Sequence, residues 1–370
     1  MILGVSAEQE ALRASVRRFL ADRAPLSRVR ALMDGGETDW AVWEQAGTQL
    51  GLQGLAIPES YGGAGFSFAE QAVVLEEFGA ALYGGPYLAS AVLAATALLA
   101  SPDEGARSGL LPDIASGQTV ATLAFTEDGG SWDPAAIRLS AVKDGEAWRL
   151  DGHKSFVLDG ATAGLILVVA TTDAGLSLFA VEGDADGLSR AALPALDQTR
   201  QLARLEFAGV TGRLIGSPGD GAAALDRALD VAAVALAAEQ LGGAQRALDM
   251  AVEYAKVRRQ FDRPIGSFQA IKHRCADLLL EVESLRSAVG YAAAAVAEDS
   301  AEIPVLASLV KAYASETYFH VAAENIQIHG GIGFTWEHDA HLYFKRAKSS
   351  ELLLGDPTYH RELLAQRIGI

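Results

Sequence analysis

The sequence predicts an α+β fold that is mainly helical and has three successive regions. Residues 1–117 show helical periodicity, residues 118–219 break into short β-rich runs, and residues 220–370 return to long amphipathic helices. An order of helices, then strands, then helices is uncommon, so it narrows the possible folds before any motif is considered.

The first region is expected to hold several helices. Ser6 with Gln9 three residues later forms a capping-box pattern at a helix start, and Pro25 is expected to stop that helix. A glycine-rich turn is expected at Ala56–Gly65. Further helical stretches are predicted near Trp40–Leu50, Ser67–Leu82 and Tyr87–Ala100.

The second region is rich in Val, Leu, Ile and Phe within short runs, which is typical of strands. Asp144-Gly145 and Asp173-Ala174-Gly175 lie between neighbouring runs and indicate hairpin turns. An antiparallel β unit is therefore predicted. Its expected strands are Thr119–Phe125, Ile137–Val142, Trp148–Asp151, Leu165–Ala170, Leu176–Val181 and Leu202–Phe207.

The third region carries the strongest helical signal. Pro304 marks the start of a long helix, because proline is tolerated in a first helical turn. Before it, one apolar stripe about five turns long predicts another long helix. The stripe consists of Ile271, Cys275, Leu278, Leu279, Val282, Leu285 and Val289.

Composition limits the function classes. The chain has 50% hydrophobic and 21% charged residues, which is ordinary globular usage. Its formal net charge of −17 repels nucleic acid and anionic lipid, so neither a nucleic-acid nor a membrane partner is expected. The one cysteine, Cys275, is expected to be inert packing in a reducing cytoplasm. Met1–Gly4 lacks the basic or apolar run of an export signal.

The segment Arg258–Gln269 lies between two strongly predicted helices. Arg258 offers phosphate a planar fork of donors, Phe261 is an aromatic side chain in the turn, and the helix after Gln269 offers its N-terminal amides. This pattern suits the pyrophosphate and ribose of a dinucleotide. A basic helix end followed by an ordinary turn is the alternative.

The segment Gln327–Phe334 follows a long predicted helix. Its Gly330 and Gly331 permit positive φ and a close approach of the backbone to a ligand. An ordinary glycine helix end is the alternative interpretation.

The segment Leu123–Ser131 ends the first predicted strand. Its hydroxyls and exposed amides, including those of Thr126 and Ser131, could meet a flavin ring. A surface β-turn explains the same residues equally well.

In this order and spacing, these segments resemble the acyl-CoA dehydrogenase family. The turn Ile57–Gly65, the pair Thr126-Glu127, and the segments Arg258–Gln269 and Gln327–Gly333 all match, over nearly the whole chain. The resemblance implies an N-terminal helical domain, a middle antiparallel β-barrel-like domain and a C-terminal four-helix bundle. It also implies FAD as the cofactor, in a crevice between domains and subunits.

The resemblance further assigns roles to individual residues. It places Thr126 and Ser131 on the flavin-ring side. The ADP half of a flavin held mainly by the neighbouring subunit is assigned Arg258, Phe261, Gln269, Gln327, Gly330 and Gly331.

The chain departs from the family at the catalytic base. Removal of the α-proton of an acyl thioester, while a β-hydride passes to the flavin, requires a carboxylate in a dry pocket. The family places a glutamate at one of two positions, which in this chain correspond to Ala232 and Leu354. The nearby Glu239 and Glu351 are better explained as exposed or capping acids.

The flavin-ring side also departs from the family. The Thr-Glu-Pro-x-x-Gly-Ser run reads Thr126–Ser131, without the proline and one residue shorter, and the Trp-Ile-Thr strand reads Phe156–Leu158. Residues offered to a neighbour's cofactor are thus retained, while those that serve the chain's own flavin ring are altered.

The resemblance therefore implies the non-catalytic subunit of a heterotetrameric, steroid-type acyl-CoA dehydrogenase that completes the FAD site of a partner chain. Expected partners are a second acyl-CoA dehydrogenase-type subunit, an acyl-CoA substrate and an electron-transfer acceptor protein. One alternative is a homo-oligomeric flavoprotein with a displaced base such as Glu239 or a different acyl-CoA reaction. Another is a non-enzymatic scaffold subunit.

The histidines of the C-terminal region show no regular ligand spacing, so no metal is expected. By the resemblance, they are expected in loops and in the tail of the chain. They are His329, His338, His341 and His360.

Overall fold

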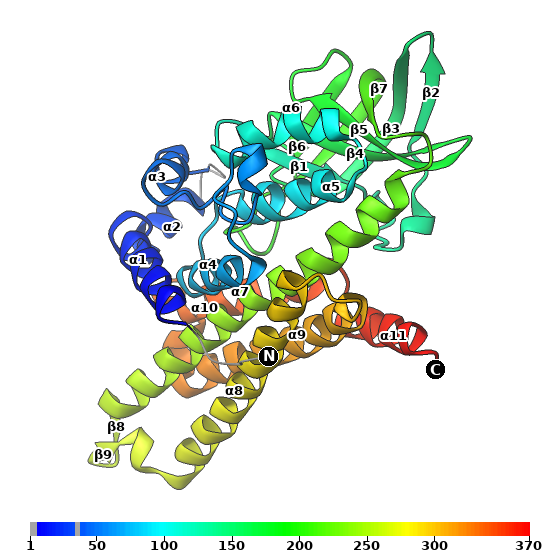
Figure 1. The fold of residues 1–370 in the computed structure, drawn as a ribbon. Helices are drawn as coiled ribbons and strands as arrows, with labels where there is room; N and C mark the ends of the chain where they lie inside the picture. Colours follow the sequence, from blue (N-terminus) through cyan, green and yellow to red (C-terminus); the bar gives the residue numbers. More distant parts are fainter. Residues whose placement is uncertain (1–5, 34–37) are drawn as a thin grey trace. The chain divides into compact units, whose positions relative to one another are not determined.

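The computed structural model describes residues 6–33 and 38–370, and these form two compact units (Figure 1). The first unit comprises the described residues of Met1–Asp34, Phe68–Tyr83 and Ala233–Ile370, and the second those of Gly35–Ser67 and Gly84–Ala232. The stretch at Met1–Gly4, where no export signal is expected, lies outside the described residues. None of the described helices is long and apolar enough to cross a lipid bilayer.

The first unit is helical apart from one short two-stranded ribbon. The capping box is confirmed, since the backbone N–H of Gln9 donates to Ser6 Oγ at 3.1 Å and that of Ser6 donates to Gln9 Oε1 at 3.1 Å. The first helix ends at Arg23, just before Pro25, as predicted. The elements are α1 (Ala7–Arg23), α2 (Leu26–Met33), α4 (Phe68–Ala81), most of α7 (Gly221–Val257), β8 (Arg259–Gln260), β9 (Arg263–Pro264), η4 (Ile265–Ser267), α8 (Gln269–Ala297), α9 (Ile303–His329), η5 (Gly330–Phe334), α10 (Ala340–Leu352) and α11 (Pro357–Ile368).

Helix α8 carries the predicted apolar stripe with one correction. Leu278, Val282, Leu285 and Val289 are buried, but Leu279 is 47% exposed, so its assignment to the stripe is wrong. The buried positions repeat with alternating steps of three and four residues, and Leu279 lies one position outside that repeat.

Helix α9 begins at Ile303 with Pro304 in its first turn, as predicted. It packs against α8, α10 and α11. One buried face of α9, here called the polar seam, is made mostly of polar side chains at heptad spacing. Its members are Ser308, Lys311, Ser315, Tyr318, Ala322, Asn325 and His329.

Helices α4 and α7 approach each other with their backbones in contact. A Cβ added at Gly242 would lie 1.7 Å from the carbonyl oxygen of Glu76, and one at Gly79 would lie 1.8 Å from that of Glu239. Only glycine permits this approach at either position.

The second unit contains a seven-stranded sheet that closes on itself. The path β4-β2-β3-β7-β5 closes because β5 pairs with β4, while β1 joins β4 and β6 joins β7. The predicted β-barrel-like domain is confirmed, and so are both hairpin turns, which connect β2 to β3 and β4 to β5. The strands are β1 (Ala121–Ala124), β2 (Ser140–Asp144), β3 (Ala147–Leu158), β4 (Leu165–Thr172), β5 (Gly175–Glu182), β6 (Leu188–Ala192) and β7 (Leu202–Ile215).

The sheet also contains two parallel pairings, β1 with β4 and β2 with β4. These strands are not joined by tight turns, so their directions are free to match. Helical elements complete the unit, and the predicted helix at Tyr87–Ala100 begins as a π-helix. They are α3 (Trp40–Leu50), η1 (Glu59–Tyr61), η2 (Leu88–Ala94), α5 (Ala95–Ala100), α6 (Glu104–Ala115), η3 (Pro134–Ala136) and the start of α7.

Candidate functional site

The connection between α7 and α8 is an exposed tip in the first unit (Figure 1). Arg258 directly follows α7, and strands β8 and β9 form a small ribbon whose turn contains Phe261. Phe261 has a φ of 51° and is 87% exposed. Gln269 opens α8, whose N-cap residue provides no side-chain hydrogen bond. The three predicted residues therefore lie on one solvent-facing tip.

This tip is locally basic although the chain as a whole is acidic. Residues 256–274 contain six Lys and Arg side chains and one acidic residue, Asp262. Arg274 pairs with Glu324 at 2.8 Å, whereas the guanidinium of Arg258 forms no hydrogen bond or ion pair with any residue that the structure describes. An unpaired guanidinium among other basic side chains is suited to bind the negatively charged pyrophosphate of a dinucleotide.

The second predicted segment begins at the end of α9. Gly330 has φ 65° and ψ −145°, a conformation essentially reserved for glycine. A Cβ added at Gly330 or Gly331 would meet no described atom within 4 Å, so the backbone here borders open space. The side chain of Gln327 is exposed beside it. This backbone can be approached closely by a flat or charged ligand.

The structure brings these two segments together. Ile328 is buried in a small core with Ala251 and Ala255, and Ile265 packs against the same core. The ring of Tyr254, one turn before Arg258, stacks on that of His329 with centroids 4.3 Å apart. Two segments far apart in the sequence therefore form one continuous surface. No sequence pattern pointed to Tyr254.

The two positions that the resemblance assigns to the catalytic base are both buried and apolar. Ala232 lies within α7 and is fully buried, while Leu354 is 5% exposed in the turn after α10. Leu354 has a φ of 62°, which is unusual for a branched residue. Neither side chain can accept a proton.

Two buried basic side chains hold the turn at Leu354. The ammonium of Lys311 donates to the carbonyl oxygens of Glu351 at 3.1 Å and Gly355 at 2.9 Å. Nε2 of His360 lies 3.0 Å from the carbonyl oxygen of Leu354. Burial lowers the pKa of His360 to about 4, so the ring is neutral and donates through Nε2 at neutral pH.

The nearby acids are already paired. Glu239 is buried and forms an ion pair with Arg346 at 2.7 Å, and Arg346 is itself buried. Glu351 pairs with Lys348 at 2.9 Å. Glu239 is therefore not the exposed acid that the sequence suggested, but a carboxylate whose charge is matched inside the helical unit.

In the second unit, Thr126 is turned away from solvent. Its hydroxyl donates to the carbonyl oxygen of Ser155 at 2.5 Å and is buried, so its proton is used within the barrel. Ser131 lies in the following loop, beside a cavity of about 420 Å³ that is also lined by Glu127, Arg138 and others.

Asp128, where the resemblance has proline, ties this loop to the barrel. Its carboxylate accepts two bonds of 3.1 Å from Arg204, one from the hydroxyl of Ser155, and lies 3.2 Å from His153. The hydrogen bonds from Arg204, with that from Ser155, lower the pKa of Asp128 to about 2. The exposed loop is thus held by internal partners.

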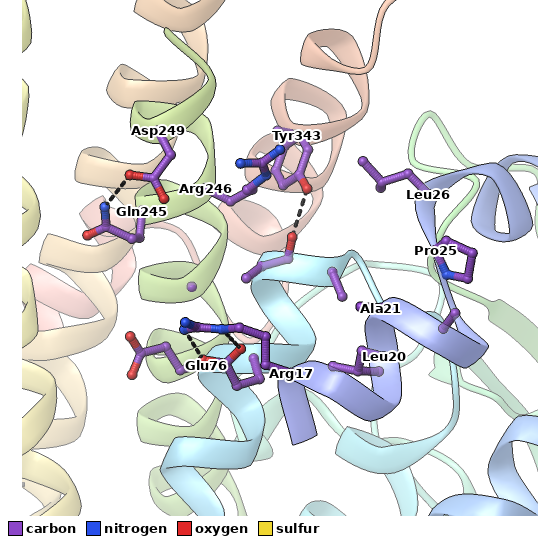
Figure 2. Close-up of a pocket in the computed structure, with 15 residues that line it drawn as sticks. Arg17, Leu20, Ala21, Pro25, Leu26, Glu76, Gln245, Arg246, Asp249 and Tyr343 are labelled. Carbon is purple, nitrogen blue, oxygen red and sulfur yellow. Dashed lines mark hydrogen bonds and ion pairs between the residues drawn. The ribbon is translucent and has the colours of Figure 1, made fainter. Parts of the chain in front are cut away.

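Figure 2 shows a further cavity of about 510 Å³ in the first unit, walled by α1, α4, α7 and α10. Its acidic side chains are largely neutralised: Glu76 pairs with Arg13 at 2.9 Å and Arg286 at 2.7 Å, and Glu77 pairs with Arg17 at 2.7 Å. None of the residues predicted for the site lines this cavity.

The histidines lie in more ordered surroundings than expected. His341 is buried within α10, so its expected position in a loop is wrong, whereas His360 lies in the C-terminal tail, buried within α11. The rings of His329 and His338 pack at a tilt of 48°, with centroids 4.3 Å apart. Among the described residues, no group of three or more His, Cys, Asp or Glu side chains could hold a metal ion.

Comparison with known proteins gives one consistent family. The acyl-CoA dehydrogenase N-terminal domain matches residues 6–118, the middle domain matches residues 122–210, and the C-terminal domain matches residues 219–369. The acyl-CoA dehydrogenase IpdE2 of Mycobacterium tuberculosis is 38% identical over 359 residues, which cover 96% of this chain and 95% of IpdE2.

Solved structures agree with these matches. A variant of the Tcur3481-Tcur3483 steroid ACAD is 34% identical with a TM-score of 0.90, over 99% of both chains. The ChsE4-ChsE5 complex from Mycobacterium tuberculosis is 31% identical with a TM-score of 0.91, over 100% of this chain and 99% of that chain.

Proposed function

This chain belongs to the acyl-CoA dehydrogenase family, and we propose that it is a subunit that completes the FAD site of a partner chain without removing the substrate proton itself. Acyl-CoA dehydrogenases are FAD-dependent oxidoreductases that act on CH–CH bonds. When bound, FAD accepts the hydride that leaves the β-carbon of the acyl group.

The retained half of the site suits the ADP part of FAD. Arg258 presents an unpaired guanidinium on a locally basic tip, and Phe261 and Gln269 share that tip. Gly330 and Gly331 offer backbone beside open space where a Cβ would obstruct a ligand, with Gln327 next to them. Because these groups face outward together, they are available to a cofactor held mainly by another chain.

The part of the site that this chain lacks is a base to remove the α-proton of the substrate. At Ala232 and Leu354 no carboxylate is present, and this observation carries the proposal. Glu239 does not replace it, because its carboxylate is already engaged in an ion pair with the buried Arg346. The partner chain would therefore supply the base, as well as most of the acyl pocket.

The relatives support a partner and suggest the substrate class. The name ChsE4-ChsE5 denotes a complex, and Tcur3481-Tcur3483 is described as a steroid ACAD. By this likeness, we infer a heterotetramer with a second acyl-CoA dehydrogenase-type subunit that acts on a bulky, steroid-like acyl-CoA. Electrons would leave the reduced flavin to an electron-transfer acceptor protein.

The proposal is tested by mixing. Expressed alone, the chain is expected to hold little flavin and to give no acyl-CoA oxidation with a dye acceptor. Co-expressed with a sister chain that has Glu at either base position, it should give a yellow, active complex. A fully flavin-loaded homo-oligomer that oxidises a thioester unaided would contradict the proposal, and a colourless complex would favour a scaffold.

A further inference from the structure

The loop between η5 and α10 has no regular structure of its own, yet it leads directly out of the glycine segment. Its backbone is held by one side chain from α2. Arg30 donates from Nη1 to the carbonyl oxygen of Trp336 at 2.8 Å and from Nη2 to that of His338 at 2.9 Å. Its Nε donates to Asp339 Oδ1 at 2.7 Å.

This contact uses the full geometry of arginine. Three different nitrogens of one planar guanidinium reach three acceptors spread over four residues, and one acceptor is a carboxylate. A lysine at position 30 would keep the charge but present a single nitrogen. The side chain of Arg30 is 28% exposed, so solvent only partly screens the interaction.

The same loop is packed from two other sides. The ring of His338 packs at a tilt against that of His329, and the ring of His329 stacks on Tyr254 beside the Arg258 tip. From α10, Lys345 lies 3.9 Å above the ring of Trp336. The loop is therefore fixed by α2, α9 and α10 together, and Arg30 of α2 donates three hydrogen bonds to it.

We propose that Arg30 is a positioning residue for the cofactor site. By fixing Trp336–Asp339, it holds Gly330 and Gly331 in the shape that receives the ADP half of FAD. The inference rests on the proposed function, because it assumes that this segment meets that half. Its physical basis is preorganisation: a loop that is already ordered loses less entropy when a ligand binds.

The first measurement uses the isolated chain and does not depend on the proposed function. Hydrogen exchange is compared in wild type, Arg30→Ala, Arg30→Lys and the control Arg18→Ala, which alters an exposed arginine of α1. We expect amides of residues 330–339 to exchange on the order of tenfold faster in Arg30→Ala, with an intermediate effect in Arg30→Lys. Unchanged exchange in both Arg30 variants would overturn the inference.

The second measurement uses the assembled complex after removal of flavin. ADP reports on the half of the site formed by this chain, and FMN reports on the ring half. Arg30→Ala should weaken ADP binding on the order of tenfold and leave FMN binding unchanged. Equal weakening of both ligands would show a general structural role and would overturn the inference.

The variant Arg258→Ala distinguishes a failure of the proposed function from a failure of the inference about Arg30. If Arg258→Ala loses ADP affinity and Arg30→Ala does not, the proposed function stands and the inference about Arg30 is wrong. If neither variant changes ADP binding, the ADP half does not meet this surface, and both fail. If Arg30→Ala does not fold, Arg30→Lys carries the same comparison.

Discussion

Leu354 is one of the two positions that we propose correspond to the family's catalytic base, and the conformation of its backbone is fixed by its surroundings. The residue has a φ of 62°, which strains a branched side chain, and such strain persists only when the surroundings impose it. Lys311 and His360 bind the carbonyl oxygens of Glu351, Leu354 and Gly355 and so impose it. The turn therefore presents whatever side chain occupies position 354 at a fixed place.

Leu354→Glu would place a carboxylate at that point, but the proposed function leaves the flavin ring and most of the acyl pocket with the partner chain. In a flavin-loaded complex whose partner has lost its own glutamate, the variant should therefore leave acyl-CoA oxidation at background, without the roughly 10²–10⁴ gain of a well-placed base. The thermal midpoint should fall, because position 354 is buried and a carboxylate there is desolvated.

The control for this experiment is Leu352→Glu, two residues earlier and 55% exposed. It adds the same charge outside the fixed turn, so it should give no gain in acyl-CoA oxidation. A gain of about tenfold or more in Leu354→Glu alone, with the flavin retained, would show that position 354 faces a reacting carbon in this chain and would contradict the proposed function.

At the scale of elements, periodicity predicted the helices better than their buried faces. The stripe of α8 was predictable because its apolar residues repeat at heptad spacing. The polar seam of α9 was not, because a run such as Ser308, Lys311 and Ser315 is typical of a solvated helix face until its partners are known. Those partners come from distant segments, as when Gln240 of α7 donates to Ser315 at 3.2 Å.

The contact between α4 and α7 gives a prediction for an element. Gly242→Ala should destabilise the chain by about 3 kcal/mol, because its Cβ would collide with the backbone of α4 and force the helices apart. Gly290→Ala is the matched control. Gly290 lies exposed in the middle of α8, and a Cβ there would meet no described atom within 4 Å. The control should stabilise by about 0.5–1 kcal/mol.

Both values are measured by urea unfolding. Equal effects of the two substitutions would mean that α4 and α7 do not pack with their backbones in contact.

At the scale of the whole molecule, the sequence predicted the order of helical and β regions and the family, because several motifs agreed in order and spacing. It did not predict how the site is supported. Arg30 and Asp339 are paired across 309 residues, and Tyr254 stacks on His329 from another helix. Neither pair leaves a local pattern, since each partner alone is an ordinary polar or aromatic helical residue.

The stability of the whole chain should depend on pH through its buried histidines. His360 has its pKa lowered from 6.5 to about 4, so the unfolded chain binds more protons than the folded chain between these values. The free energy of unfolding should therefore fall as pH drops from 6.5 to 4, by roughly 3 kcal/mol from this residue. Burial also lowers the pKa values of His329, His338 and His341, which act in the same direction.

Urea unfolding at several pH values between 7 and 4 measures this dependence. His360→Gln should flatten the slope in that window, whereas His273→Gln, at an exposed position, should keep it. A slope that His360→Gln leaves as steep as in the wild type would rule out His360 as its source.

The polar seam also fixes the distance between two parts of the first unit. Lys311, in the N-terminal half of α9, donates a hydrogen bond to the turn that contains Leu354. His329, at the C-terminal end of α9, leads into the glycine segment and stacks on Tyr254. Eighteen residues of helix keep these two ends about 27 Å apart. With Lys311 bonded to the turn and His329 packed against Tyr254, α9 cannot slide by a turn without breaking these contacts. The side chain at position 354 can therefore differ while the spacing and shape of the glycine segment stay unaltered.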